Sequence, residues 1–77
     1  MLRSARLKDA NIFIDGAQDS TFTNCHIIAA KNCVFHSCVF VDSTLDLETE
    51  QCGKNALISN CEFHKSKVLM GKFEGRS

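Results

Sequence analysis

Residues 33–45 read CVFHSCVFVDSTL, and within this stretch two Cys-Val-Phe triplets begin five residues apart. A spacing of five matches neither the period of an α-helix nor that of a β-strand. Cys33 and Cys38 could therefore be metal ligands, part of a disulfide framework, or equivalent positions of a repeat. A repeat is the first alternative to test, because a missed repeat leads to the wrong fold.

Five-residue units can be followed in both directions from these triplets. Twelve units cover residues 5–29, 33–47 and 56–75, and the insertions 30–32 and 48–55 separate the three runs. The first position of the unit is small in eleven units, and the third position is large and apolar in eleven. Length and composition fit one small domain over 1–77.

The first and third positions of a unit lie two residues apart, so in an extended segment both side chains point the same way. Each unit is therefore predicted to be a short strand with two inward side chains, followed by a corner. We expect an all-β fold whose strands stack about 4.8 Å apart. The predicted core consists of the large third-position residues Leu7, Ile12, Phe22, Ile27, Phe35, Phe40, Leu45, Ile58, Phe63, Val68 and Phe73, with the cysteines Cys25, Cys33, Cys38 and Cys61.

These units resemble those of the pentapeptide-repeat family, whose pattern is a small residue, a polar residue, Leu or Phe, and two variable residues. The resemblance implies a right-handed parallel β-helix with four sides, here a quadrilateral solenoid of about three coils. The first and third positions carry it, whereas Val34 and Val39 stand at second positions where the family favours Asp or Asn. Four units per coil would stack Leu7, Ile27 and Ile58 in one column.

A three-sided coil remains an open alternative. Other right-handed β-helices have three sides and repeat short Asn-Cys-x-Phe-like units, which resemble the stretches beginning at Asn24, Asn32 and Asn60. Such a coil would keep the same inward residues. In either architecture Asp15 takes an inward position, and because an unpaired buried carboxylate is costly, we expect its unit to be distorted or open to water.

The cysteines are interpreted as small packing residues rather than ligands. Zinc ligands must converge on one point, but His36 is predicted to point outward while Cys33 and Cys38 point inward. Five cysteines without a visible secretory signal favour free thiols in a reducing, cytoplasmic location. Cys52 lies in an insertion, and we expect it to tuck under that loop. No metal, cofactor or disulfide is predicted.

Charge and motifs exclude several classes of function. The formal net charge is zero, with an acidic middle over residues 9–50 between basic ends. That is not the basic stripe of a nucleic-acid-binding protein. No apolar run approaches the length of a membrane-spanning helix. The histidines stand beside no recognisable nucleophile motif, so no catalytic residue is predicted and the chain is not expected to be an enzyme.

The insertion 48–55 is the feature most typical of function, because exposed loops on rigid scaffolds often carry recognition. The alternative is a solvated corner without a partner. Outward valines form a second candidate contact surface, and the open ends of a short stack must be covered, so a homodimer is expected. The predicted partner-binding residues are Asp42, Asp46, Glu48, Glu50, Lys54, Val34, Val39 and Val41.

Two functions follow from these observations. The first is a non-enzymatic protein-binding or adaptor module. The second is implied by the family resemblance: a DNA mimic that inhibits or protects a bacterial type II topoisomerase (DNA gyrase). Three coils span about 15 Å, or only four to five base pairs of DNA. An acidic face shared by Asp9, Asp19 and the acids of residues 42–50 would favour mimicry, and acids scattered over the corners would favour the adaptor.

Overall fold

This computed structural model describes residues 1–52 and 55–70, and the predicted core residue Phe73 lies outside them. All strands in this part of the chain pair in parallel. They are β1 (Leu2–Arg3), β2 (Arg6–Lys8), β3 (Asn11–Gln18), β4 (Thr21–Thr23), β5 (His26–His36), β6 (Val39–Val41), β7 (Thr44–Asp46), β8 (Leu57–Ser59), β9 (Glu62–His64) and β10 (Lys67–Leu69).

The strand register shows how many units complete one circuit of the chain. Leu7 pairs with Phe22, three units later. Phe22 pairs in turn with Phe40, and Phe40 with Phe63. The insertion 30–32 lies between Phe22 and Phe40, and the insertion 48–55 lies between Phe40 and Phe63. When the insertions are left out of the count, the two members of each pair are again three units apart. The chain is therefore all-β with parallel sheets, an arrangement compatible with a β-helix.

The predicted four-sided stacking is wrong, because a circuit contains three units. Leu7 stacks on Phe22 rather than on Ile27, and Ile27 pairs with Ile12 and Leu45. The third position is apolar in every unit. Apolar residues therefore stack on apolar residues whether three or four units complete a circuit. The hydrophobic pattern therefore cannot distinguish the two, and the turn made at each corner decides.

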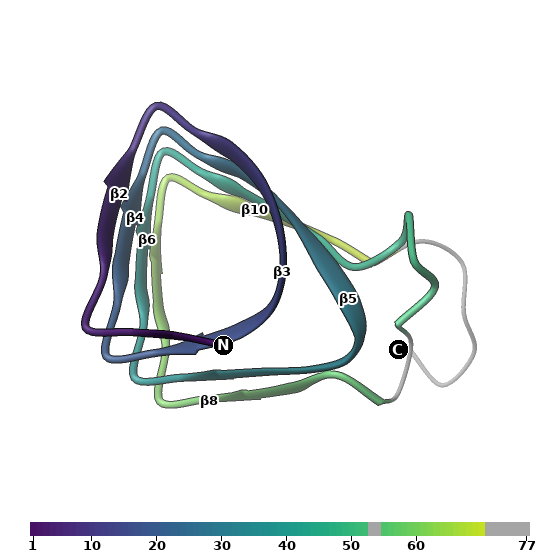
Figure 1. Cartoon of the computed structure of the whole chain (residues 1–77). Helices are drawn as coiled ribbons and strands as arrows, with labels where there is room; N and C mark the ends of the chain where they lie inside the picture. The colour runs from purple at the N-terminus through teal and green to yellow at the C-terminus, as the bar shows by residue number, and fades with distance from the viewer. Residues whose placement is uncertain (53–54, 71–77) are drawn as a thin grey trace.

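The circuits have a triangular outline (Figure 1), and we name its three walls in chain order. Wall 2 is a four-stranded sheet of β2, β4, β6 and β9. A second sheet bends around the remaining two walls because β3 and β5 each run through a corner. Wall 3 holds the first halves of β3 and β5 with β7 and β10, and wall 1 holds β1, the second halves of β3 and β5, and β8.

Two of the corners turn at a single residue in the left-handed region. Asp, Asn and Ser tolerate this conformation better than most residues, because their short polar side chains can hydrogen-bond locally. Lys65 occupies the same conformation with φ 54° and lacks that advantage. The corner residues are Ser4, Asp19, Ser37 and Asn60 between walls 1 and 2, and Asp9, Asn24, Asp42 and Lys65 between walls 2 and 3.

The core is a stack of aromatic and aliphatic side chains inside the triangle. Phe40 lies between Phe22 and Phe63, with ring centroids 5.2 and 4.7 Å away and nearly parallel rings. Phe35 meets Phe40 edge-on at 5.9 Å. Of the predicted core residues, Phe22, Ile27, Phe35, Phe40, Leu45, Cys25, Cys33 and Cys38 are buried, and Leu7, Ile12, Ile58, Phe63, Val68 and Cys61 are half-buried.

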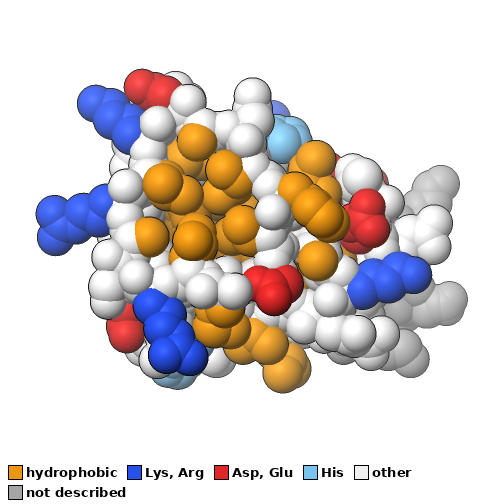
Figure 2. Space-filling model, viewed as in Figure 1, with side chains coloured by type: hydrophobic (Ala, Val, Ile, Leu, Met, Phe, Trp, Pro, Cys, Tyr) orange, Lys and Arg blue, Asp and Glu red, His pale blue; other side chains and the backbone are white. Residues whose placement is uncertain are grey.

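The half-buried members of this set belong to the first and last circuits. They lack a neighbouring circuit on one side within the described residues, which leaves part of each side chain exposed. Figure 2 looks along the stack and shows hydrophobic side chains gathered within the triangular outline. The core is thus continuous along the axis and partly open at its end.

Small first-position residues do more than pack. Ser43 Oγ donates to Val41 O at 2.9 Å and accepts from Cys25 N at 3.0 Å. Ser66 Oγ repeats this one circuit later, donating to His64 O and accepting from Ser43 N, each at 3.0 Å. The Cys25 thiol donates to Thr23 O at 3.3 Å. The interpretation of the first-position residues only as packing residues was incomplete, because their hydroxyl and thiol groups also form hydrogen bonds with backbone groups at the corners.

The expected distortion at Asp15 is confirmed. The strand register shifts between Ile14 and Gly16, and the Asp15 side chain is 65% exposed. Gly16 takes the buried position instead, with φ 149°, and a Cβ there would lie 2.1 Å from Val34 O. Only glycine fits this close approach of two backbones.

Candidate interaction site at the acidic insertion

The longer insertion lies between β7 and β8, at the corner between walls 3 and 1, and it projects from the triangle (Figure 1). Residues 48–51 form a turn in which Gln51 N donates to Glu48 O at 3.1 Å. Glu48, Thr49 and Gln51 are exposed, and Glu50 is half-buried. The predicted contact residue Lys54 lies outside the described residues.

Asp46 supports this turn from inside. Its Oδ1 accepts from the amides of Glu48 and Thr49, each at 2.9 Å, and its Oδ2 accepts from Thr49 Oγ1 at 2.6 Å. Burial opposes ionisation, but the hydrogen bonds from Thr49 and Glu48 and the nearby His26 outweigh it and hold the pKa of Asp46 below its ordinary value. Asp46 is 6% exposed, so its assignment as a partner-binding residue is corrected: it caps the turn.

Cys52 anchors the other end of the turn. It is 1% exposed, its amide donates to Leu47 O at 3.0 Å, and its thiol lies 3.3 Å from both Ala29 O and Ala30 O. The expectation that Cys52 tucks under the loop is confirmed. Because Ala30 is the first residue of the shorter insertion and Ala29 precedes it, the longer insertion packs on the shorter one.

The thiols at this corner are not activated. Burial, with a contribution from the neighbouring Cys52, raises the pKa of Cys33 to about 11. Burial likewise raises the pKa of Cys52. Both thiols therefore stay protonated at neutral pH, where a thiol is a poor nucleophile. All five cysteines are free.

The remaining acids do not join the insertion. Asp42 lies at the corner between walls 2 and 3, in the same column as Asp9 but separated from it by Asn24, whereas Asp19 lies at the corner between walls 1 and 2. Asp42 is therefore not part of the surface formed by Glu48 and Glu50. Acidic side chains are distributed over all three corners instead of forming one continuous face.

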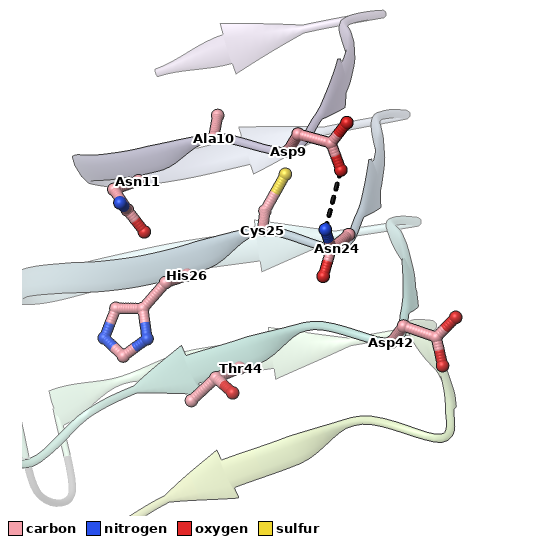
Figure 3. A pocket seen from close by; sticks show the side chains of 8 residues that line it. All are labelled: Asp9, Ala10, Asn11, Asn24, Cys25, His26, Asp42 and Thr44. Carbon is pink, nitrogen blue, oxygen red and sulfur yellow. Dashed lines mark hydrogen bonds between the residues drawn. The ribbon is translucent and has the colours of Figure 1, made fainter.

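Asp9 and Asp42 line a shallow hollow of about 380 Å³ (Figure 3). Within it, Asn24 Nδ2 donates to Asp9 Oδ1 at 2.6 Å, while Asp42 points away from this pair. Its lining is mostly polar. The lining residues are Asp9, Ala10, Asn11, Asn24, Cys25, His26, Asp42 and Thr44.

The predicted valine surface is divided between two walls. Val39 and Val41 lie together on β6 in wall 2, paired with Thr21 and Thr23 of β4. Val34 lies on wall 1, between Gly16 and Leu57. All three valines are half-buried. Only Val39 and Val41 can therefore belong to one flat contact surface.

No protein-family model matches the chain, and no curated protein matches it. Across residues 1–52 and 55–70, no group of three or more His, Cys, Asp or Glu side chains is placed to hold a metal ion. The same part of the chain includes no helix with the length and hydrophobicity needed to cross a membrane.

Sequence reasoning found the insertion and missed its supports. The order Asp46-Leu47-Glu48-Thr49 places an Asx-type acceptor before two free amides, a signal for a capped turn. The left-handed corners also have a signal, because Asp, Asn or Ser recurs at the fifth position of most units that end in such a corner. Contact of Cys52 with Ala29 and Ala30 has no signal in the sequence, because it depends on how the circuits stack.

Proposed function

We propose that this chain is a non-enzymatic protein-binding module that presents the turn of residues 48–51 to a basic surface of a protein partner. In this proposal the scaffold is a right-handed β-helix built from units like those of pentapeptide-repeat proteins. Connections between parallel strands are right-handed in nearly all proteins, which supports that handedness. The three-unit circuit supports a triangular coil.

The observation that carries the proposal is the rigid support of an exposed acidic turn. Asp46 and Cys52 hold the two ends of the turn through buried contacts, while Glu48 remains exposed between them. A solvated corner without a partner needs neither support. A turn that is ordered before binding loses less conformational entropy on binding, so this arrangement favours recognition.

Mimicry of DNA receives less support. A mimic needs a dense, continuous array of negative charge, whereas these acids occupy three corners and Asp46 is buried within a turn. A topoisomerase partner nevertheless makes a direct test. We expect the purified protein to leave DNA gyrase supercoiling unchanged at micromolar concentration. Inhibition, or protection from a quinolone, that is lost when the turn is altered would favour mimicry instead.

The proposal itself is tested with charge-reversed turns. A Glu48→Lys, Glu50→Lys variant keeps both anchors, and an Asp9→Lys, Asp42→Lys variant makes the same charge change at another corner. Proteins of the native host that cross-link to the wild type are identified, purified and titrated against all three chains. The turn variant should bind a genuine partner at least tenfold more weakly, with the difference shrinking in high salt, and the corner variant should bind as the wild type does.

Equal binding by all three chains would contradict the proposal, since no contact would then depend on the turn. Equal weakening by both variants would also contradict it, because net charge alone would explain the loss. Unfolding curves in urea, measured on each variant, separate a lost contact from a lost fold.

A further inference from the structure

Wall 2 carries a self-complementary pattern of side chains that the proposed function does not use. Each of its four strands contributes one row of outward side chains, and β2 and β9 form the two opposite edges of the sheet. Strand pairing aligns the rows in two columns. The first column is Arg6, Thr21, Val39 and Glu62, and the second is Lys8, Thr23, Val41 and His64.

The two central rows are uncharged and β-branched. Thr21, Thr23, Val39 and Val41 are all half-buried and stand side by side on adjacent strands. Short β-branched side chains on neighbouring strands make a flat surface with few rotamers to immobilise. Such a surface can pack against another sheet face at about 10 Å separation with little entropic cost.

The two edge rows carry opposite charge. Arg6 and Lys8 are exposed on β2 and make that row basic. Glu62 and His64 are exposed on β9, where the Glu62 carboxylate lies 3.0 Å from His64 Nε2. The wall therefore runs from a basic edge through a neutral centre to an edge that contains the carboxylate.

We propose that wall 2 binds wall 2 of a second copy of this chain, face to face. A twofold axis parallel to the strands reverses the strand order, so that β2 of each copy faces β9 of the other. The symmetry then forms two equivalent pairs in which Arg6 of one copy faces Glu62 of the other, and the β-branched rows pack in the centre. A twofold axis along the stack would instead oppose the two basic rows, and like charges disfavour that dimer.

The size of the wall sets the strength of the association. Four strands span about 14 Å and each three-residue strand about 10 Å, so the contact is smaller than a standard specific interface and has the size of a weak, transient one. We therefore infer a weak, reversible dimer that forms at tens to hundreds of micromolar. The insertion lies at the corner opposite wall 2 and stays free, so this inference does not rest on the proposed function.

Charge exchange tests the orientation directly. Sedimentation velocity over a concentration series compares the wild type with Arg6→Glu, Glu62→Arg and the double variant. The wild type should approach twice its monomer mass of 8.6 kDa. Each single variant should raise the dimer dissociation constant about tenfold, because both symmetric pairs become repulsive, and the double variant should restore it because each pair is again opposite in charge.

A matched control changes charge on another wall. Lys67→Glu alters an exposed residue of wall 3 and should leave the dimer unchanged. The inference is overturned if the wild type stays monomeric throughout the series, if the single variants dimerise as the wild type does, or if the folded double variant fails to recover. Circular dichroism and thermal melts establish that each variant is folded.

Discussion

Wall 2 and the corner between walls 3 and 1 are built from the same five-residue units, yet only the corner contains inserted residues. In wall 2 every strand has three residues, and each adjoining corner turns at one left-handed residue. At the other corner β3 and β5 run through the bend, the insertion 30–32 lies within β5, and the insertion 48–55 lies between β7 and β8. A corner without a fixed turn can accept extra residues, because an insertion in one circuit packs on an insertion in the next.

The largest expected effect comes from breaking the regular region at its centre. Phe40 is fully buried between two parallel aromatic rings, so Phe40→Ala removes both contacts and leaves a cavity. We expect the free energy of unfolding in urea to fall by about 3–5 kcal/mol. Phe13→Ala is the control, because Phe13 is 61% exposed on wall 3 and should change stability by less than about 0.5 kcal/mol. Similar losses for the two variants would refute a core centred on Phe40.

A smaller loss should follow at the insertion. Asp46→Asn keeps the size of the side chain and weakens its hydrogen bonds to Glu48 and Thr49. We expect a loss of about 0.5–2 kcal/mol at pH 7, the range for removed caps. Thr49→Ser, which retains the hydroxyl, should cost less.

The Asp46 loss should depend on pH. The pKa of Asp46 is lowered in the folded state from an ordinary value of 3.8, so the carboxylate contributes stability above pH 3.8. That contribution is lost as the pH falls through the lowered folded value. The difference between wild type and Asp46→Asn should therefore shrink between pH 5 and pH 2, and a constant difference would show that the charge is not involved.

The smallest effect sharpens the role of the left-handed corners. Lys65 holds φ 54° in a column otherwise occupied by Asp and Asn. Lys65→Asn should raise the unfolding free energy by about 0.5–1 kcal/mol, because Asn tolerates this conformation. Lys67→Asn makes the same change of charge on a strand and should not stabilise the protein. A gain in both variants would point to charge rather than backbone conformation.

Much of the interior could be predicted from the sequence. Burial of Phe22, Phe35 and Phe40 follows from the spacing of two residues between inward positions, which holds for any extended unit. The site was predictable only in part. The insertion and its exposed Glu48 were found, but Asp46 was assigned to the surface because a sequence does not reveal that both carboxylate oxygens are occupied.

The sequence by itself determined which side chains point inward, where the five-residue rhythm is interrupted, and that Asp15 could not stay in the core. These properties depend on residues a few positions apart along one chain. Tertiary structure alone decided that three units close a circuit, that Cys52 rests on Ala29 and Ala30, and that the acids spread over three corners. The physical reason is that the angle at each corner sets which units become neighbours, and no apolar pattern encodes that angle.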